Sequence, residues 1–445
     1  MTIVQKFIYL QSLFKYNSIE NCEQKQMFDK QIIYYLSTEN QFYKNFSNNN
    51  YQQLLILSNK IKSKLDLLQN PKNCSEAKII VYENNCFDCG LGYLLYELYY
   101  CFTYAIKSGR TMIINNLNQK LYKFDVKLNE IFKSTSKCNY EEHVKPFLPI
   151  NDYLEKEQTD RITLFQNKDE MAKQISDDAP IQIKDTLLKY HSSPIIWFYG
   201  QIKNYIMKTN KEINQQINKI ASKIPFECGP VVGIHVRRTD KIQEAKLFKL
   251  DDYMKWVEFW FDVNEDKQQN IKQNYCTNKR MLYIATDEIN VFKEAKIKYG
   301  DRYEIYHQKV FKNETLYKSK EALIELLALY HILSKCQFLT CRTVYELMQV
   351  FQGDASRNVH SLDYLYGIDR NQVAIIEYKP KHEHPIMPEE LWADKGDIIV
   401  ATSPVHKDGL IRAKNIYSNK EGNFPMYFLK KYTKFDHFSA FDNFK

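Results

Sequence analysis

The stretch Val231-Val232-Gly233-Ile234-His235-Val236-Arg237-Arg238-Thr239-Asp240-Lys241 joins an apolar, β-branched run to a cluster of charged side chains. Its first six residues predict a strand that ends in a polar loop. Ligands of open α/β sheets bind at the carboxyl ends of strands, so we expect a ligand at this loop. Adjacent Arg237 and Arg238 indicate phosphate, because a planar guanidinium matches two phosphate oxygens. A solvated ion-pair cluster at a strand end is the alternative.

Strands and helices alternate in the chain around this stretch, which predicts a parallel sheet and an α/β fold. Residues 281–286 predict a second strand, and Asp287 and Glu288 follow it directly. Carboxylates at that strand tip would hold the guanidinium groups of Arg237 and Arg238 in place. The alternative for Asp287-Glu288 is a simple cap on the following helix.

The block His235 to Lys241 resembles the α-1,6-fucosyltransferase family, and the similarity continues in order along residues 70–435. The family's next residues correspond to Lys241-Ile242-Gln243-Glu244-Ala245 and Asp251-Asp252-Tyr253-Met254. Members transfer fucose from GDP-fucose to the innermost N-acetylglucosamine of N-glycans, in α-1,6 linkage. The resemblance therefore implies an inverting glycosyltransferase with this donor and an N-glycan acceptor on glycoproteins.

The resemblance also implies roles for single residues. Glu244 matches the family's proposed base and Lys241 its relay partner, Asp240 would orient an arginine or the acceptor, and Arg237 would stabilise the departing β-phosphate. The donor-binding residues that it implies are His235, Arg237, Arg238, Tyr253, Asp287 and Glu288. No cofactor and no divalent metal are expected, because the family works without one and the sequence contains no Asp-x-Asp motif. For Glu244 the alternative is an exposed loop glutamate.

The family's architecture divides the chain into four expected segments. They are a helical or coiled-coil stem (1–70), a first catalytic half (71–225), a Rossmann-like GDP-fucose-binding half (226–378) and an SH3-like barrel (386–435), with the two halves in a GT-B-like arrangement. Apolar residues recur at helical spacing between Leu54 and Leu68. This helix would join two copies into a homodimer, as family stems do, or pack on its own domain. Residues 194 onward predict one long amphipathic helix before the Arg-Arg strand.

Two departures from the family bear on activity. Cys341 continues directly into Arg342-Thr343-Val344-Tyr345-Glu346, without the short loop that supplies a serine and a glutamine to the donor phosphate. An aspartate that the family uses near the nucleotide base corresponds to Leu329. The alternative function is therefore a weak or inactive member that binds glycan or protein partners. In the barrel, Leu410-Ile411 replace the usual tryptophan pair, which favours packing or oligomerisation over binding of Pro-rich peptides.

Composition limits the classes of partner. The 445 residues carry 62 basic and 54 acidic side chains, a net charge of +8 that is too balanced to indicate nucleic acid. Hydrophobic residues make up 44%, enough for a large core. No apolar stretch reaches the ~20 residues that span a bilayer. The resemblance implies the Golgi lumen, and the cytoplasm is the alternative because no signal anchor is visible.

Cysteines and sequons bear on the compartment too. Cys74, Cys86, Cys89 and Cys101 form a cluster that includes one Cys-x-x-Cys pair, whereas a zinc ribbon requires two. Disulfides are the prediction, with three pairings left open, and reduced buried thiols are the alternative. The family has a disulfide-tied loop here, and Cys138 is the candidate partner of Cys74. Sequons at Asn45, Asn73 and Asn313 fit a luminal protein.

Overall fold

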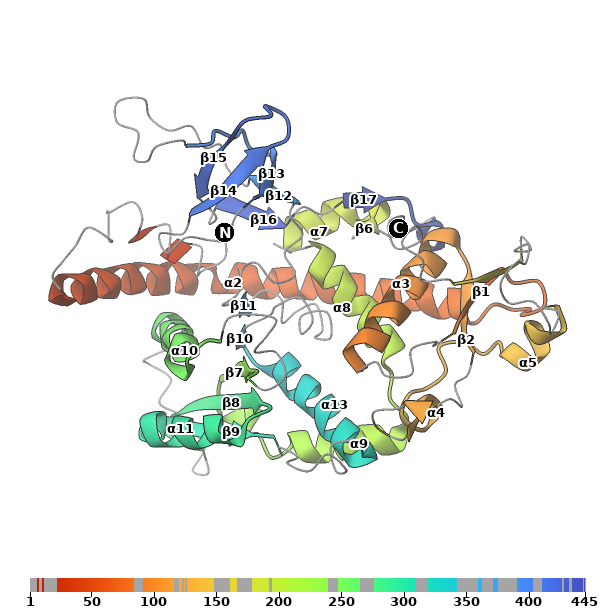
Figure 1. Cartoon of the computed structure of the whole chain (residues 1–445), viewed down its shortest axis with the longest axis horizontal. Helices are drawn as coiled ribbons and strands as arrows, with labels where there is room; N and C mark the ends of the chain where they lie inside the picture. Colours follow the sequence, from red (N-terminus) through yellow and green to blue (C-terminus); the bar gives the residue numbers. More distant parts are fainter. Residues whose placement is uncertain are drawn as a thin grey trace.

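The computed structural model is a mixed α/β structure in which two larger parallel sheets and one larger antiparallel sheet are accompanied by two two-stranded sheets (Figure 1). It describes residues 6–7, 10–11, 22–83, 91–115, 120–121, 124, 126–147, 161–165, 178–191, 194–238, 247–264, 276–308, 319–341, 359–361, 371–374, 390–402, 410–425, 428–431, 434–442 and 444. The predicted α/β class is confirmed. None of the helices in these ranges is long and apolar enough to cross a membrane.

The first parallel sheet has the strand order β2 (Thr111–Ile114), β1 (Ile79–Tyr82), β5 (Ile162–Leu164). All four residues of β1 are buried, since apolar clusters cover both faces of the strand. Helix α3 (Leu91–Ser108) packs on β1 and β2, and α7 (Lys184–Tyr190) and α8 (Pro194–Ile206) contribute to the same apolar cluster. Shorter elements of this half are β3 (Lys120–Leu121), β4 (Val126–Lys127), α4 (Leu128–Ile131), α5 (Tyr140–His143), η3 (Lys145–Phe147), β6 (Asp178–Pro180) and η4 (Ile181–Ile183).

The single long helix predicted from residue 194 is wrong. Two helices are present, α8 and α9 (Lys211–Ala221), with a break at residues 207–210. Asn210 begins α9, because its side-chain oxygen accepts from the backbone N–H of Ile213 at 2.9 Å. Its amide nitrogen donates to the Glu130 carbonyl at 2.6 Å, and Thr209 forms a β-bridge with Phe132. An N-cap and a tertiary contact thus interrupt a continuous helical pattern.

The second parallel sheet contains the Arg-Arg strand at its centre. After η5 (Phe226–Cys228), its order is β11 (Val359–Ser361), β10 (Phe338–Cys341), β7 (Val231–Val236), β8 (Arg280–Thr286), β9 (Tyr303–His307). Helices α10 (Leu250–Asn264), α11 (Ile289–Tyr299) and α13 (Lys320–Lys335) pack against this sheet. A side chain at Gly233 would come within 2.8 Å of Leu333, so glycine allows α13 to pack directly on β7.

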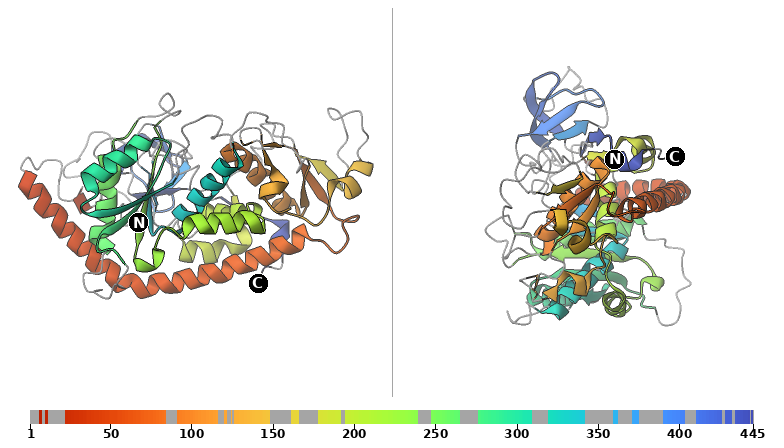
Figure 2. Two further views of the ribbon diagram at one scale, coloured as in Figure 1. Left: turned by 90° about the horizontal axis from the view of Figure 1, so that it is seen from below. Right: turned by 90° about the vertical axis from the view of Figure 1, so that its right-hand side faces the viewer.

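The long helix α2 (Cys22–Gln69) runs along one side of the molecule past both sheets (Figure 2). Its residues Leu54, Leu57, Ile61 and Leu65 lie in the core of the first half. Nearer its start, Ile32 and Leu36 pack on Phe259 and Val263 of α10. For these residues the structure shows packing of the helix on its own chain.

The antiparallel sheet near the C-terminus has the order β15 (Glu421–Pro425), β14 (Leu410–Asn415), β13 (Ile398–Ala401), β12 (Asn371–Ala374), β16 (Leu429–Lys431). It therefore includes a strand from before residue 386, the expected start of this segment. Leu410 and Ile411 are buried, and Ile411 packs with Ile399 and Phe424. The Pro-rich linker at residues 379–385 lies outside the described residues.

The chain returns to the first half after this sheet. Strand β17 (Lys434–Asp436) pairs in parallel with β6, and η8 (Ser439–Phe441) packs on α3 and α2. The Lys107 ammonium lies 2.8 Å from the buried Asp178 carboxylate and 2.9 Å from Asp436. Burial alone would lower the pKa of Lys107, but the two carboxylates raise it above its usual value. We call residues 434–441 the C-terminal strap.

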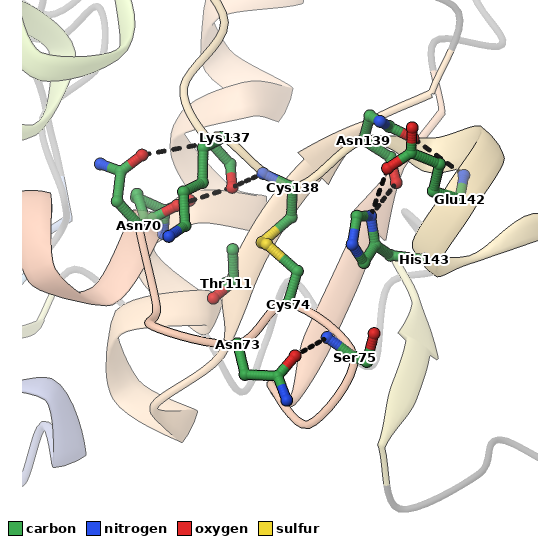
Figure 3. The surroundings of a disulfide bond; sticks show 12 residues. Asn70, Asn73, Cys74, Ser75, Thr111, Lys137, Cys138, Asn139, Glu142 and His143 are labelled. Atoms are coloured by element: carbon green, nitrogen blue, oxygen red, sulfur yellow. Dashed lines mark hydrogen bonds and ion pairs between the residues drawn. A yellow bond between two sulfur atoms is a disulfide. The ribbon is translucent and has the colours of Figure 1, made fainter.

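Two disulfides are present among the described cysteines. Cys74 pairs with Cys138, as the family resemblance suggested (Figure 3), and Cys228 pairs with Cys276, a pairing that was not predicted. The prediction that Cys101 takes part in a disulfide is wrong. Cys101 is a free thiol, fully buried in the core of the first half. Cys86 and Cys89 lie outside the described residues.

Candidate active site

The order of strands in the second sheet reverses at β7, and in open parallel sheets such a reversal creates a crevice at the carboxyl edge of the sheet. From β7 the chain adds β8 and β9 on one side, and then β10 and β11 on the other. The switch point therefore lies between β7 and β10, where His235 is in register with Cys341. Ligands of open parallel sheets bind in the crevice at such a point. Arg237 and Arg238 follow β7 at this edge, as predicted.

Asp287 holds both arginines from the neighbouring strand β8. Its carboxylate accepts the backbone N–H of Arg238 at 3.0 Å and lies 3.9 Å from Nε of Arg237. Val236 is in register with Thr286, so the two strands end side by side and bring these residues together. The Arg237 side chain is 37% exposed, which leaves it accessible to a ligand. The predicted supporting role of Asp287 is thus consistent with its position.

Arg238 is held against α11 rather than directed outward. Its guanidinium lies 3.8 Å from the carboxylate of Glu288 and 3.5 Å from that of Glu294. Glu294 also pairs with Lys298 at 2.9 Å, and Lys298 reaches Asp251 at the start of α10. These contacts form a chain of charges from the Arg-Arg loop to α10. Sequence reasoning missed Glu294, whose one local signal is its i,i+4 spacing from Lys298.

The substitution Glu294→Gln is expected to weaken binding of GDP by up to about 5-fold, since ion pairs near the surface contribute roughly 0.2–1 kcal/mol. The amide keeps the shape of the side chain but removes the charge that holds Arg238. Calorimetric titration with GDP measures the effect. Lys298→Ala is the matched control: it removes the other partner of Glu294 and should leave the affinity for GDP unchanged. Equal losses in both variants would contradict a specific role of Glu294 at Arg238.

His235 is a neutral side chain on β7. Burial, followed by the nearby positive charge of Arg237, lowers its pKa to about 4, although Asp287 opposes the shift. A neutral imidazole has one donor and one acceptor nitrogen. At pH 7 it can therefore donate one hydrogen bond to a nucleotide and accept another, without adding positive charge.

Acidification should reveal this shifted pKa as a loss of stability. Between pH 6.5 and pH 4 an unfolded chain protonates His235 while the folded chain does not, so folding becomes less favourable as the pH falls. The shift corresponds to at most about 3 kcal/mol. Urea denaturation of the ligand-free protein at several pH values, compared with His235→Gln, should show a steeper loss in the wild type. Parallel pH profiles for the two proteins would contradict it.

The structure places the other predicted site residues differently. Tyr253 is buried in the core of the second half, where its ring packs edge-on against Phe248. Leu329, which replaces the family's aspartate, is buried on α13 beside Ile332 and Leu333. Helix α13 is apolar at this position, as its core role requires.

The predicted catalytic residues Asp240, Lys241 and Glu244 lie outside the described residues, as do residues 342–358, which follow Cys341. Within the described ranges, no group of three or more His, Cys, Asp or Glu side chains is arranged to hold a metal ion.

Paired arginines at the switch point of a parallel α/β sheet are the kind of arrangement that suits a phosphate-bearing ligand. Residues 10–367 match the family described as alpha-(1,6)-fucosyltransferase N- and catalytic domains. The alpha-(1,6)-fucosyltransferase of Caenorhabditis elegans is 30% identical over 399 residues, which are 85% of this chain and 68% of that protein. The Drosophila melanogaster enzyme is 28% identical, covering 83% of this chain and 59% of its own length. The chain belongs to the alpha-(1,6)-fucosyltransferase family, a family of glycosyltransferase enzymes.

Solved structures give weaker similarity. Fucosyltransferase NodZ from Bradyrhizobium is 12% identical with a TM-score of 0.33, over 64% of this chain and 96% of NodZ. A structure of Arabidopsis thaliana FUT1 in complex with GDP is 11% identical with a TM-score of 0.36, over 68% and 76% of the two chains. The family assignment rests on the sequence matches.

Proposed function

We propose that this enzyme transfers fucose from GDP-fucose to the innermost N-acetylglucosamine of N-glycans in α-1,6 linkage, with inversion at the anomeric carbon. The observation that carries the proposal is the pair Arg237 and Arg238 at the sheet's switch point, braced by Asp287, Glu288 and Glu294. Family membership supports fucosyl transfer as the reaction.

The donor half of the reaction builds negative charge on the departing β-phosphate. Arg237 would take this charge, because its guanidinium is accessible and lies beside Asp287, with Nε 3.9 Å from the carboxylate. Arg238 would contribute through its positive charge alone, since its side chain is held by two carboxylates and its backbone N–H donates to Asp287. As the family resemblance implies, the transfer would require no divalent metal. A chelator should therefore leave the transfer rate unchanged.

The acceptor half requires a base within hydrogen-bonding distance of the attacking hydroxyl. Glu244 would accept that proton, Lys241 would relay it, and Asp240 would orient an arginine or the acceptor. These three roles come from the family resemblance. In the sequence they follow Arg238 by two, three and six positions.

The proposal includes a luminal compartment and a homodimer. The two disulfides support an oxidising compartment such as the Golgi lumen. A second copy would bind along the first part of α2, where Met27, Tyr34 and Tyr35 expose their apolar side chains. Light scattering of the wild type and a Tyr34→Ser/Tyr35→Ser variant would test the dimer.

The direct test incubates the purified chain with GDP-fucose and a glycopeptide that carries a complete N-glycan. The expected product gains one fucose on the innermost N-acetylglucosamine, and NMR should show the α anomer from the β-linked donor. Glu244→Gln should abolish transfer while leaving GDP affinity intact, because it removes only the base. Folded wild-type protein that binds GDP but never transfers fucose would contradict the proposal.

A further inference from the structure

We propose that Asn73 is a site of N-linked glycosylation on this enzyme itself. Asn73-Cys74-Ser75 forms an Asn-x-Ser acceptor sequence. In the transfer, the side-chain nitrogen of Asn73 forms a bond to the anomeric carbon of an oligosaccharide carried on a lipid diphosphate. The bond from that carbon to the phosphate oxygen breaks, the lipid diphosphate leaves, and the amide loses one proton to the base of the host oligosaccharyltransferase. This modification is separate from the donor site described above.

Asn73 lies in the turn between α2 and β1, and both Asn73 and Ser75 are exposed. The Asn73 side-chain oxygen accepts from the backbone N–H of Ser75 at 3.0 Å, which places the amide beside the serine (Figure 3). Its nitrogen donates to the Glu76 carboxylate at 2.8 Å. A glycosylated amide keeps one hydrogen, so this contact can persist after modification. The folded turn therefore accommodates a glycan on the surface.

Asn73 lies near the amino edge of the first parallel sheet. Strand β1 begins at Ile79, so Asn73 precedes the amino end of the first parallel sheet. The carbonyl of Ser75 accepts from Arg161, which itself precedes β5 at that end. Ligands bind at the carboxyl ends of parallel strands, which is the opposite edge. An oligosaccharide on Asn73 would consequently extend from the amino edge of the first sheet, away from its carboxyl edge.

The disulfides provide independent support for exposure to the glycosylation machinery. Cys74 lies inside the sequon and pairs with Cys138, and a second pair joins Cys228 to Cys276. Such bonds form in the secretory pathway, where N-glycosylation also takes place. Cys138 follows Cys74 by 64 residues. At roughly 5–20 residues per second, its synthesis lags by ~3–13 s, so the sequon is accessible before the disulfide closes.

The other two sequons are less suitable or not placed. Asn45 lies within the helical span of α2, whose backbone would have to unwind to present it as a loop. Asn313 lies outside the described residues. The inference is therefore confined to Asn73.

Peptide mass spectrometry of the full chain tests the site directly. The chain is directed into the secretory pathway of insect cells by an added signal peptide and is recovered from cells and medium. The peptide spanning Asn73 should carry an oligosaccharide, and peptide-N-glycosidase should convert Asn73 to aspartate. Asn73→Gln and Ser75→Ala should each remove this glycan, whereas Asn70→Gln, an exposed asparagine outside the sequon, should retain it. Recovery of the Asn73 peptide only in unmodified form, or glycans only at Asn45 or Asn313, would overturn the proposal.

Discussion

Replacing Arg237 with alanine is expected to lower kcat/KM for fucosyl transfer by about 10²–10³-fold, the loss typical when one preorganised group that stabilises developing negative charge is removed. Arg237 is the more exposed of the two arginines, and it lies beside Asp287. Steady-state kinetics with GDP-fucose, together with calorimetric titration of GDP, measures the effect. Arg237→Lys should retain part of the affinity, because it keeps the charge but loses bidentate geometry.

The matched control is Arg302→Ala. Arg302 precedes β9 at the opposite, amino edge of the same sheet, where it pairs with Glu258 at 2.7 Å. The variant removes the same charge from the chain without altering the switch point, so kinetics should stay near wild type. Unchanged GDP binding in Arg237→Ala, or equal losses in both variants, would contradict the assignment of the donor phosphates to Arg237.

The second large effect concerns stability. Phe438→Ala in the C-terminal strap should destabilise the first half by about 3–5 kcal/mol, as expected for a buried phenylalanine cut to alanine. Phe438 is completely buried, and its ring packs edge-on against Phe198 of α8 at a centroid distance of 5.7 Å. Its backbone carbonyl also accepts from the Gln182 side chain at 2.9 Å. The cavity would open inside the core shared by α3 and α8.

Differential scanning calorimetry should show a lower midpoint for the transition that includes the first half, by roughly 10 °C. Tyr417→Ala is the control, since it deletes a mostly exposed aromatic ring from the turn between β14 and β15 and should change stability by less than about 0.5 kcal/mol. A Phe438→Ala midpoint equal to that of wild type would show that the strap does not stabilise the first half.

The sequence alone predicted much of the local structure. The β-branched run 231–236 and the run 281–286 form the strands β7 and β8, because period and composition are local properties that a segment retains in the fold. It also placed Arg237, Arg238, Asp287 and Glu288 at strand tips, since a polar residue that follows a buried strand must leave the sheet at its edge. The break at Asn210 was missed although Thr209-Asn210 is a local signal for a new helix start.

Long-range pairings were decided only by the tertiary structure. The contact of Glu294 with Arg238, the disulfide from Cys228 to Cys276 and the return of Phe438 to the first half join residues far apart in the chain. Burial of Tyr253 likewise depends on how α10 packs on the sheet. Periodicity shows which face of a segment is apolar but not which other segment covers it. The sequence therefore determined the strands and the arginines at their tips, and packing determined which side chains brace them.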